Sequence, residues 1–336
     1  MIAEREFAQN PDAWASNIEL ELQSRDRKGV GRRNSSSCKR PRPAVALLSS
    51  TRMLKWILSL TFALSLAAQE PPENINWLTN VEYSAVGEPV QMDIAIPKSG
   101  VGPFPAVLCI HGGGFRAGSR DRYHELVWKL AQRGYVAATA SYRLSPKYQF
   151  PAHVHDVKAA VRFLRARAKT YKLDPNRIGV TGGSAGGTLV LMLGTTSDVA
   201  EFEGTGPNLD QSSAVQTVVN YYGATDFTES YGKSVDAHEV LPLYLGGNVE
   251  QARENHIRSS PLYWVTPNAA PTLTIHGTAD RFVAYEQGLW IHDALKKNGV
   301  ESELLTLTGA DHGFRKPEYA KQAEEALFAW FDSHLK

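Results

Sequence analysis

One serine lies between glycines where two apolar runs of different character meet. The segment reads Ile178-Gly179-Val180-Thr181-Gly182-Gly183-Ser184-Ala185-Gly186-Gly187, and an apolar run of helical length follows at 188–193. The β-branched residues before the glycines predict a short buried strand, and the run after them predicts a helix. This Gly-x-Ser-x-Gly pattern is typical of a tight strand-to-helix turn that exposes the serine oxygen near the positive end of the helix. A glycine-rich turn without a chemical role has the same local pattern. Residues elsewhere in the chain are therefore needed to distinguish a catalytic serine from a purely structural turn.

A second glycine cluster follows an earlier predicted strand. The continuous apolar run at 105–110 predicts a buried strand, and it ends in His111-Gly112-Gly113-Gly114. Glycines let a backbone approach a ligand closely, and backbone N–H groups stabilise the negative oxygen that develops during acyl transfer. We expect these donors, the oxyanion hole, to come from Gly113, Gly114 and Ala185, with His111 bracing the loop.

A serine nucleophile needs a base and a carboxylate that orients the base. Asp280 follows a predicted strand at 271–276, and His312 follows the next predicted strand at 303–307. Because the carboxyl ends of parallel strands meet at one edge of an open sheet, we expect both side chains near Ser184. Asp226 also follows a strand and is the alternative acid, although a role in shaping the loop suits it better.

Strands and helices alternate along the chain after residue 74, which predicts an α/β fold. Two segments at 81–84 and 90–96 alternate polar and apolar residues and predict an antiparallel edge pair. The region 227–268 has no clear pattern apart from a polar helix near 249–257. We predict a mostly parallel, twisted sheet of about eight strands with helices on both faces and no large cap domain. Further strands are expected at 135–140 and 214–221, and further helices at 120–132, 154–168, 285–298 and 318–335.

The first seventy residues have a different character. Residues 1–52 include a stretch rich in Arg, Lys, Ser and Pro, which we interpret as a disordered extension or an artefact of the assigned start. Residues 53–69 begin with Met53 and hold a short apolar run before a proline-rich break, which is typical of a secretory signal peptide. We therefore expect residues 70–336 to form the catalytic domain of a secreted or periplasmic protein without a stable membrane anchor. A genuine basic extension followed by a membrane anchor is the alternative.

Composition excludes several classes of function. The net charge is +1 over 336 residues, so no strong field indicates a nucleic-acid partner. The two cysteines, Cys38 and Cys109, lie in segments of opposite character, which argues against a disulfide framework or a cysteine-rich metal site. The sequence does not specify an oligomeric state.

Together, these motifs resemble the α/β-hydrolase superfamily, and within it the bifunctional feruloyl and acetyl-xylan esterase-like hydrolases, which are related to the hormone-sensitive-lipase esterases. The resemblance implies that Ser184 is the nucleophile, His312 the base and Asp280 the acid. It also implies hydrolysis of short-chain carboxylic esters without a metal or organic cofactor, with acetyl and feruloyl esters of plant polysaccharide as candidate substrates. From their positions in the chain, Phe115, Tyr142 and the region 227–268 are expected to form pocket walls. The segments that carry the resemblance are His111–Phe115, Tyr142–Ser145, Gly182–Gly187, His276–Asp280 and Gly309–Phe314.

Two features of this sequence differ from the pattern of these relatives. Ala284 stands where relatives commonly have proline, and the helical N-terminal cap of the lipase-like relatives is absent. The missing cap predicts an open site that suits a bulky or polymeric substrate. A small amidase such as a formamidase, or a serine peptidase, would use the same triad. A non-catalytic ligand-binding protein is the alternative from another class.

Overall fold

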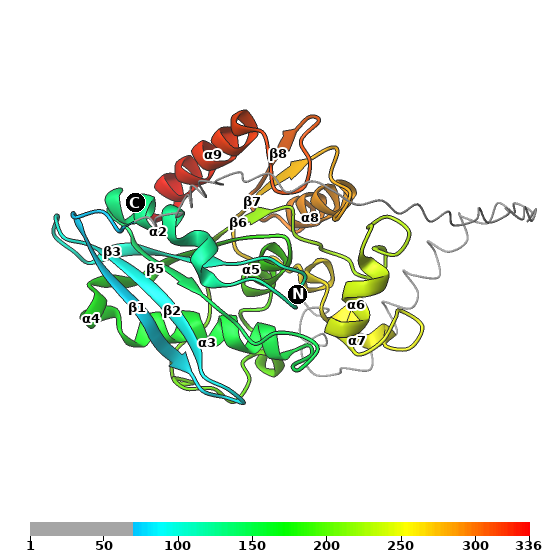
Figure 1. Ribbon diagram of the computed structural model, residues 1–336, viewed down its shortest axis with the longest axis horizontal. Helices are drawn as coiled ribbons and strands as arrows, with labels where there is room; N and C mark the ends of the chain where they lie inside the picture. The colour runs from blue at the N-terminus through cyan, green and yellow to red at the C-terminus, as the bar shows by residue number, and fades with distance from the viewer. Residues whose placement is uncertain (1–69) are drawn as a thin grey trace, which may run out of the picture. The chain divides into compact units, whose positions relative to one another are not determined.

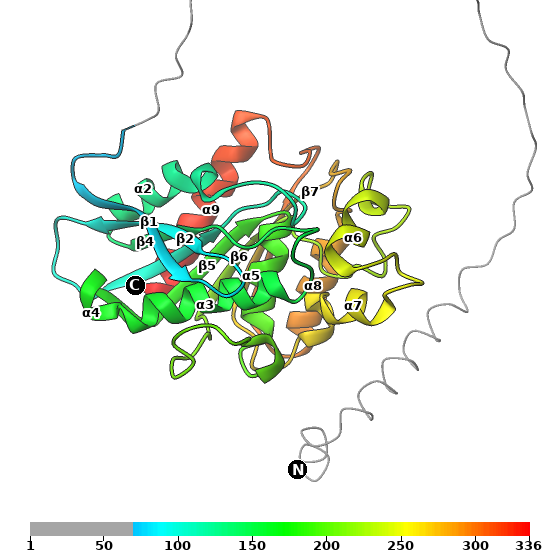
Figure 2. The ribbon, with the colours of Figure 1, turned by 60° about the horizontal axis from the view of Figure 1, so that its bottom comes forward.

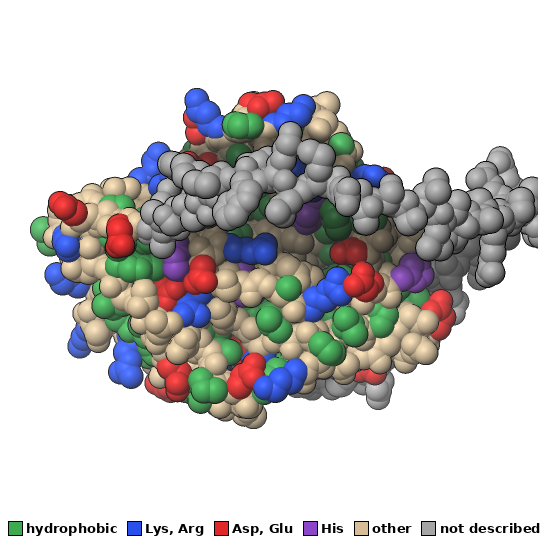
Figure 3. Space-filling model, viewed as in Figure 1, with side chains coloured by type: hydrophobic (Ala, Val, Ile, Leu, Met, Phe, Trp, Pro, Cys, Tyr) green, Lys and Arg blue, Asp and Glu red, His purple; other side chains and the backbone are tan. Residues whose placement is uncertain are grey.

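The computed structural model describes residues 70–336. The predicted N-terminal extension, the predicted signal peptide and Cys38 lie outside the described residues. Within them, no helix is both long enough and apolar enough to cross a membrane. On the face of the domain seen in Figure 3, acidic and basic side chains are interspersed, so neither sign of charge dominates there.

The described chain forms one eight-stranded sheet (Figure 1), as the alternation of strands and helices predicted. The strands lie in the order β1-β2-β4-β3-β5-β6-β7-β8. β2 pairs antiparallel with both β1 and β4, and all the other neighbours are parallel. The bounds are β1 Ile75–Ser84, β2 Val90–Pro97, β3 Phe104–Ile110, β4 Val136–Ala140, β5 Leu173–Gly183, β6 Thr217–Tyr221, β7 Thr272–Gly277 and β8 Ser302–Leu307.

Helices cover both faces of this sheet (Figure 2). The α-helices are α2 His124–Gln132, α3 Ala152–Ala166, α4 Ala168–Tyr171, α5 Ala185–Thr195, α6 Ala237–Leu245, α7 Arg253–Arg258, α8 Glu286–Lys297 and α9 Pro317–Leu335. Short 3-10 helices are η1 Arg120–Tyr123, η2 Ala200–Phe202 and η3 Pro261–Trp264. One apolar core lies between the sheet and α3, α5 and α8, and a second lies between the sheet and α2 and α9.

Strand β3 contributes side chains to both cores, because its side chains alternate in direction. Leu108 and Ile110 belong to the core under α3 and α5, whereas Val107 and Cys109 belong to the core under α2 and α9. Successive side chains of a strand point to opposite faces, so a fully apolar run such as β3 fits only a sheet that is covered twice. Burial raises the pKa of the Cys109 thiol well above its ordinary value, which is consistent with a purely packing role.

The segment between β6 and β7 differs from the sequence prediction. It contains α6, which the sequence pattern does not predict, and the predicted polar helix near 249–257 is shorter and forms α7. Pro242 lies inside α6 and obscures its helical pattern, but buried side chains such as Val240, Leu241 and Tyr244 hold the helix against the domain. These two short helices are the only α-helices between β6 and β7 in the described chain, so no large cap domain is present within residues 70–336.

Candidate active site

Ser184 occupies the turn between β5 and α5, as predicted. Its backbone φ is +58°, a conformation that costs a non-glycine residue free energy and is typical of functional sites. The N–H of Ser184 donates to the carbonyl of Tyr221 at 2.9 Å, which ties the turn to the end of β6. A Cβ on Gly186 would lie 2.1 Å from the carbonyl oxygen of Ile110, so only glycine fits there. The helix α5 begins at Ala185 and places its positive N-terminus beside the serine.

The loop after β3 lies next to this turn. Gly113 has a φ of +123°, and a Cβ on it would lie 2.1 Å from the carbonyl oxygen of Ala117, so this turn also requires glycine. Among the backbone hydrogen bonds of residues 70–336, none uses the N–H of Gly113, Gly114 or Ala185 as donor. These N–H groups are therefore available to an incoming oxygen, which is what the predicted oxyanion hole requires.

His111 braces this loop rather than acting as a base. Its imidazole is buried, stacks on Tyr142 with ring centroids 4.3 Å apart, and makes a 2.9 Å hydrogen bond through Nδ1 to the carbonyl of Gly112. Burial lowers the pKa of His111 to about 4, because a charged ring is disfavoured away from water. The ring therefore stays neutral near pH 7.

Tyr142 is the one predicted pocket residue that the structure places elsewhere. Its hydroxyl donates to the carbonyl of His111 at 3.0 Å, and its ring is buried beneath the loop instead of lining the cavities beside Ser184. The expectation that Tyr142 forms a pocket wall is wrong, because the close approach of its ring to His111 turns it into a support of the oxyanion loop.

Asp280 and His312 meet after the ends of β7 and β8. The Nδ1 of His312 lies 2.7 Å from Oδ2 of Asp280. The other carboxylate oxygen accepts the backbone N–H groups of Phe282 and Val283, each at 2.9 Å. Burial alone would raise the pKa of Asp280, but the nearby imidazole of His276, the hydrogen bond with His312 and the backbone N–H of Val283 outweigh it and hold that pKa well below its ordinary value. Asp280 is therefore a fixed anion that orients the imidazole.

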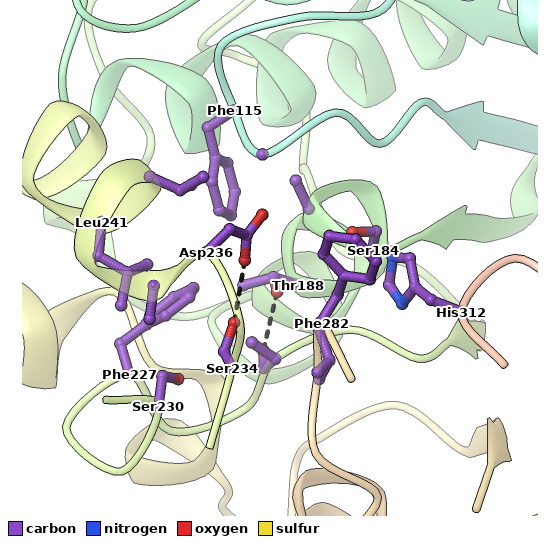
Figure 4. Close-up of a pocket in the computed structure, with 16 residues that line it drawn as sticks. Phe115, Ser184, Thr188, Phe227, Ser230, Ser234, Asp236, Leu241, Phe282 and His312 are labelled. Carbon is purple, nitrogen blue, oxygen red and sulfur yellow. Dashed lines mark hydrogen bonds between the residues drawn. The ribbon is translucent and has the colours of Figure 1, made fainter. Parts of the chain in front are cut away.

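Ser184 and His312 line the same two cavities, and Figure 4 shows the imidazole beside the serine. The two side chains make no hydrogen bond with each other in the described chain. Such contacts are often long before substrate binds and shorten in the complex.

Two neighbouring polar residues have structural roles. The Nε2 of His276 makes a 3.0 Å hydrogen bond to the carbonyl of Val283, which holds the loop that carries Asp280. Asp226 is buried and accepts hydrogen bonds from Thr228 and from the hydroxyl of Tyr263, so it shapes the loop after β6. The carboxylate of Asp226 thus has partners other than His312, in agreement with the role predicted for it.

A small cavity, which we call the inner cavity, opens beside Ser184 and has a volume of about 80 Å³. Figure 4 shows Phe115, Phe227 and Leu241 gathered on the side away from His312. The ring of Phe115 stacks on Tyr244 with centroids 3.7 Å apart. The inner cavity is lined by Gly114, Phe115, Ser184, Ala185, Thr188, Ala224, Phe227, Ser230, Ser234, Asp236, Ala237, Val240, Leu241, Phe282, Val283 and His312.

A wider cavity, which we call the outer cavity, adjoins the inner cavity at Ser184 and has a volume of about 460 Å³. Tyr222 forms part of it, and its ring packs on the imidazole of His312 with centroids 4.6 Å apart. The outer cavity is lined by Gly112, Gly113, Gly114, Arg116, Arg122, Tyr123, Gly183, Ser184, Tyr222, Asp236, Val240, Phe282, His312 and Gly313.

The sequence does not single out Tyr222, Asp236 or Phe282, although Asp236 lies in the region 227–268 that was expected to form pocket walls. Tyr222 follows β6 directly and Phe282 lies two residues after Asp280, so the rule that placed Asp280 and His312 at the strand ends could have found them. Asp236 precedes the unpredicted helix α6. Its carboxylate accepts the hydroxyl of Ser234 at 2.9 Å and lines both cavities, as Figure 4 shows for the inner one.

A group of potential metal ligands lies outside this site. Within residues 70–336, Asp93, Asp121 and His124 bring ligand atoms within 4.8 Å of one another. The buried carboxylate of Asp93 already pairs with Arg120, whose Nε lies 2.9 Å from Oδ2. None of these residues lines the inner or the outer cavity.

A serine on a strand-to-helix turn of this sheet, followed along the chain by an acid after β7 and a histidine after β8, defines an α/β-hydrolase. The chain belongs to the BD-FAE family, whose model matches residues 92–295.

Relatives from sequence and structure comparisons carry esterase names. The probable carboxylic ester hydrolase LipM of Mycobacterium tuberculosis is 32% identical over 67% of this chain and 53% of its own length. A truncated carbohydrate esterase from gut microbiota superimposes with a TM-score of 0.72 at 25% identity, covering 79% of this chain and 99% of that one. Esterase 2 of Thermogutta terrifontis with butyrate bound superimposes with a TM-score of 0.66 at 26% identity, covering 78% and 95%. The chain spans about half the length of the curated relatives that it matches first.

Proposed function

We propose that the protein is a serine hydrolase of carboxylic esters. The observation that carries this proposal is the placement of Ser184, on a strained turn beside an imidazole that a buried carboxylate holds at 2.7 Å through Nδ1. That contact leaves Nε2 of His312 as the nitrogen that can take a proton from the serine. The esterase names of the relatives point to the same reaction.

The reaction then proceeds in two acyl transfers. His312 takes the proton of the Ser184 hydroxyl as Oγ of Ser184 attacks the carbonyl carbon of the ester. The carbonyl oxygen of the ester then becomes negative. The N–H groups of Gly113, Gly114 and Ala185 stabilise that oxygen, each by on the order of 3 kcal/mol. The carbon–oxygen bond to the alcohol breaks, and the alcohol leaves with the proton held by His312. Water then attacks the acyl-enzyme by the same steps, with His312 taking its proton, and the carboxylic acid is released as Ser184 regains its proton.

The inner cavity is the site of the acyl group in this proposal. It is narrow, apolar on the side of Phe115 and Leu241, and adjacent to the N–H groups of Gly114 and Ala185. A cavity of about 80 Å³ suits a short acyl group such as acetyl and has little room for a feruloyl group. The outer cavity, lined by His312 and Gly313, would take the alcohol that receives its proton from His312. An alcohol that is part of a plant polysaccharide fits this wide opening.

Hydrolysis of three esters by the full-length chain tests the proposal: p-nitrophenyl acetate, methyl ferulate and acetylated xylan. We expect p-nitrophenyl acetate to be cleaved faster than methyl ferulate. Ser184→Ala should lower kcat by on the order of a thousandfold or more on every ester that is cleaved. Ser99→Ala, a change at an exposed serine, should leave kcat unchanged and serves as the control. An inactive, folded wild type would overturn the proposal, and faster cleavage of acetanilide than of phenyl acetate would replace it with an amidase.

We also propose that the protein is exported, because of the signal-like pattern that begins at Met53. N-terminal sequencing of the protein from its native source should find a mature terminus near Gln69. A terminus before Met53 would refute the proposal.

A further inference from the structure

The inner cavity has a polar side that the steps of ester hydrolysis do not use. Figure 4 shows Ser230, Ser234 and Asp236 on the side of the cavity away from His312. A purely hydrocarbon acyl group would leave these side chains without a partner in the substrate, and buried polar groups without partners weaken binding. Besides Ser184 and His312, the polar lining side chains are Thr188, Ser230, Ser234 and Asp236.

The hydroxyl groups on this side have already donated their protons. Thr188 donates to a backbone carbonyl at 2.8 Å, and Ser230 donates to another at 3.2 Å. Ser234 donates to the carboxylate of Asp236 at 2.9 Å. A hydroxyl has a single proton and two lone pairs, so what these groups still offer to the cavity is the capacity to accept. The polar side therefore favours an acyl group that donates hydrogen bonds.

Asp236 is the residue before the first turn of α6, where an aspartate usually caps the helix by accepting a backbone N–H. Here the side chain makes no such bond. The backbone carbonyl of Asp236 accepts the N–H groups of Glu239 and Val240 instead, each at 2.9 Å. Within residues 70–336, the carboxylate accepts only the hydroxyl of Ser234. Figure 4 shows one carboxylate oxygen toward Ser234 and the other turned away from it, so the second oxygen is available to a ligand.

The charges around the cavity favour a cation at this oxygen. Asp236 is the only acidic side chain that lines the inner cavity in the described chain, and no lysine or arginine of that part lines it. In the outer cavity, Arg116 is paired with Glu239 at 2.6 Å, and Arg122 is exposed to solvent, which screens its charge. The carboxylate of Asp236 therefore attracts a positive acyl group and repels a negative one. An ammonium group has three N–H donors, which match the free acceptors of this side.

We propose that the inner cavity takes a short acyl group that carries an ammonium group, and that Asp236 selects this acyl group. The inference rests on the proposed ester hydrolysis and deepens it by naming the class of acyl group. The ammonium donates to the free oxygen of Asp236, whose position Ser234 holds, and Ser230 offers a further acceptor. No bond to the ammonium forms or breaks, so it leaves with the carboxylic acid product.

The test compares two ethyl esters of nearly equal shape, ethyl 3-aminopropanoate and ethyl butyrate, in the full-length chain. The acyl group of the first ends in an ammonium and that of the second in a methyl group. We expect Asp236→Asn to lower the ratio of kcat/KM for the amino ester to that for the butyrate roughly tenfold or more, the effect of one lost charge-assisted hydrogen bond. Comparing the ratio between wild type and variant cancels the different chemical reactivity of the two esters.

Glu229→Gln is the matched control. It also removes one negative charge from the segment between β6 and α6, but Glu229 is exposed and lines neither cavity. The control should leave the ratio unchanged. Equal falls in the two variants would overturn the inference, because the general charge of the protein rather than a contact in the cavity would then be responsible.

Two further measurements use the same groups. Ser234→Ala keeps the carboxylate but removes the bond that orients it, so the ratio should fall by less than in Asp236→Asn. For an acyl group of opposite charge, Asp236→Asn should raise kcat/KM for monoethyl succinate relative to that for ethyl 4-methylpentanoate, which has a similar shape without the charge. A ratio for the amino ester that stays unchanged in Asp236→Asn would overturn the inference and leave ester hydrolysis in place. A wild type that cleaves neither these esters nor p-nitrophenyl acetate would overturn the proposed function and the inference together.

Discussion

The Nδ1 atom of His312 lies 2.7 Å from Oδ2 of Asp280, at the point where the loops after β7 and β8 meet. Because Nδ1 is engaged, Nε2 is the imidazole nitrogen left for Ser184. Two backbone N–H groups and the low pKa of Asp280 keep the carboxylate ionised and in place. This pair determines what the site can do chemically.

Replacing the acid should remove most of the activity. Asp280→Asn keeps the shape of the side chain but removes the charge that holds the imidazole and stabilises its protonated form. We expect kcat on p-nitrophenyl acetate to fall by on the order of 10³–10⁴-fold. Asp226→Asn is the matched control, because Asp226 is also buried but bonds to Thr228 and Tyr263. It should reduce kcat by less than about tenfold, and the reverse ranking of the two variants would make Asp226 the acid.

Widening the inner cavity should change the preferred acyl length. Leu241→Ala removes a wall residue on α6, and each further buried methylene of a substrate is worth about 0.8 kcal/mol. We expect the ratio of kcat/KM for p-nitrophenyl hexanoate to that for the acetate to rise about tenfold, since room for two more methylenes corresponds to roughly 1.6 kcal/mol. Leu243→Ala changes a leucine on the same helix that does not line the cavity, and it should leave the ratio unchanged. Equal ratios in both variants would mean that the acyl group binds elsewhere.

The glycine after the nucleophile turn should tolerate no side chain. In Gly186→Ala the new Cβ would clash with the backbone oxygen of Ile110, and neither backbone can move without disturbing β3 or α5. We expect a loss of about 3 kcal/mol in the free energy of unfolding, which corresponds to a Tm lower by about 10 °C. Gly206→Ala is the control, because its Cβ would meet no atom closer than 3.5 Å. Thermal unfolding followed by circular dichroism compares the two variants, and an unchanged Tm for Gly186→Ala would contradict the packing described for the turn.

Acid should destabilise the fold partly through His153. Burial lowers the pKa of this side chain from 6.5 to about 3. Between these values the unfolded chain binds a proton that the folded chain does not, so stability rises with pH there and is lost as the pH falls from about 6.5 toward 3. In urea titrations from pH 6.5 to 4.5, wild type should lose about 1.4 kcal/mol per pH unit more than His153→Gln. The exposed His238, changed to Gln, should follow wild type, and parallel curves for wild type and His153→Gln would contradict the argument.

The positions of the site residues relative to the strands could be predicted, and the cavity walls could not. Ser184, Asp280 and His312 each follow a strand with a clear apolar pattern, so the sheet itself places them at one edge. The sequence does not predict helix α6, because Pro242 interrupts its helical pattern and because packing, rather than local preference, stabilises the helix. Tyr142 was misplaced because the sequence does not show that its ring stacks under His111. The direction of a side chain in a loop depends on contacts of this kind, between residues that are far apart in the sequence.

Covalent labelling with a fluorophosphonate, followed by mass spectrometry of the peptides, tests the central claim most directly. The account predicts that the full-length wild type takes up one phosphonyl group on Ser184, and that Ser184→Ala takes up none. Folded His312→Ala should react at a rate lower by on the order of a thousandfold, because the serine then lacks its base. Labelling of a residue other than Ser184, or equal labelling of wild type and Ser184→Ala, would contradict the account.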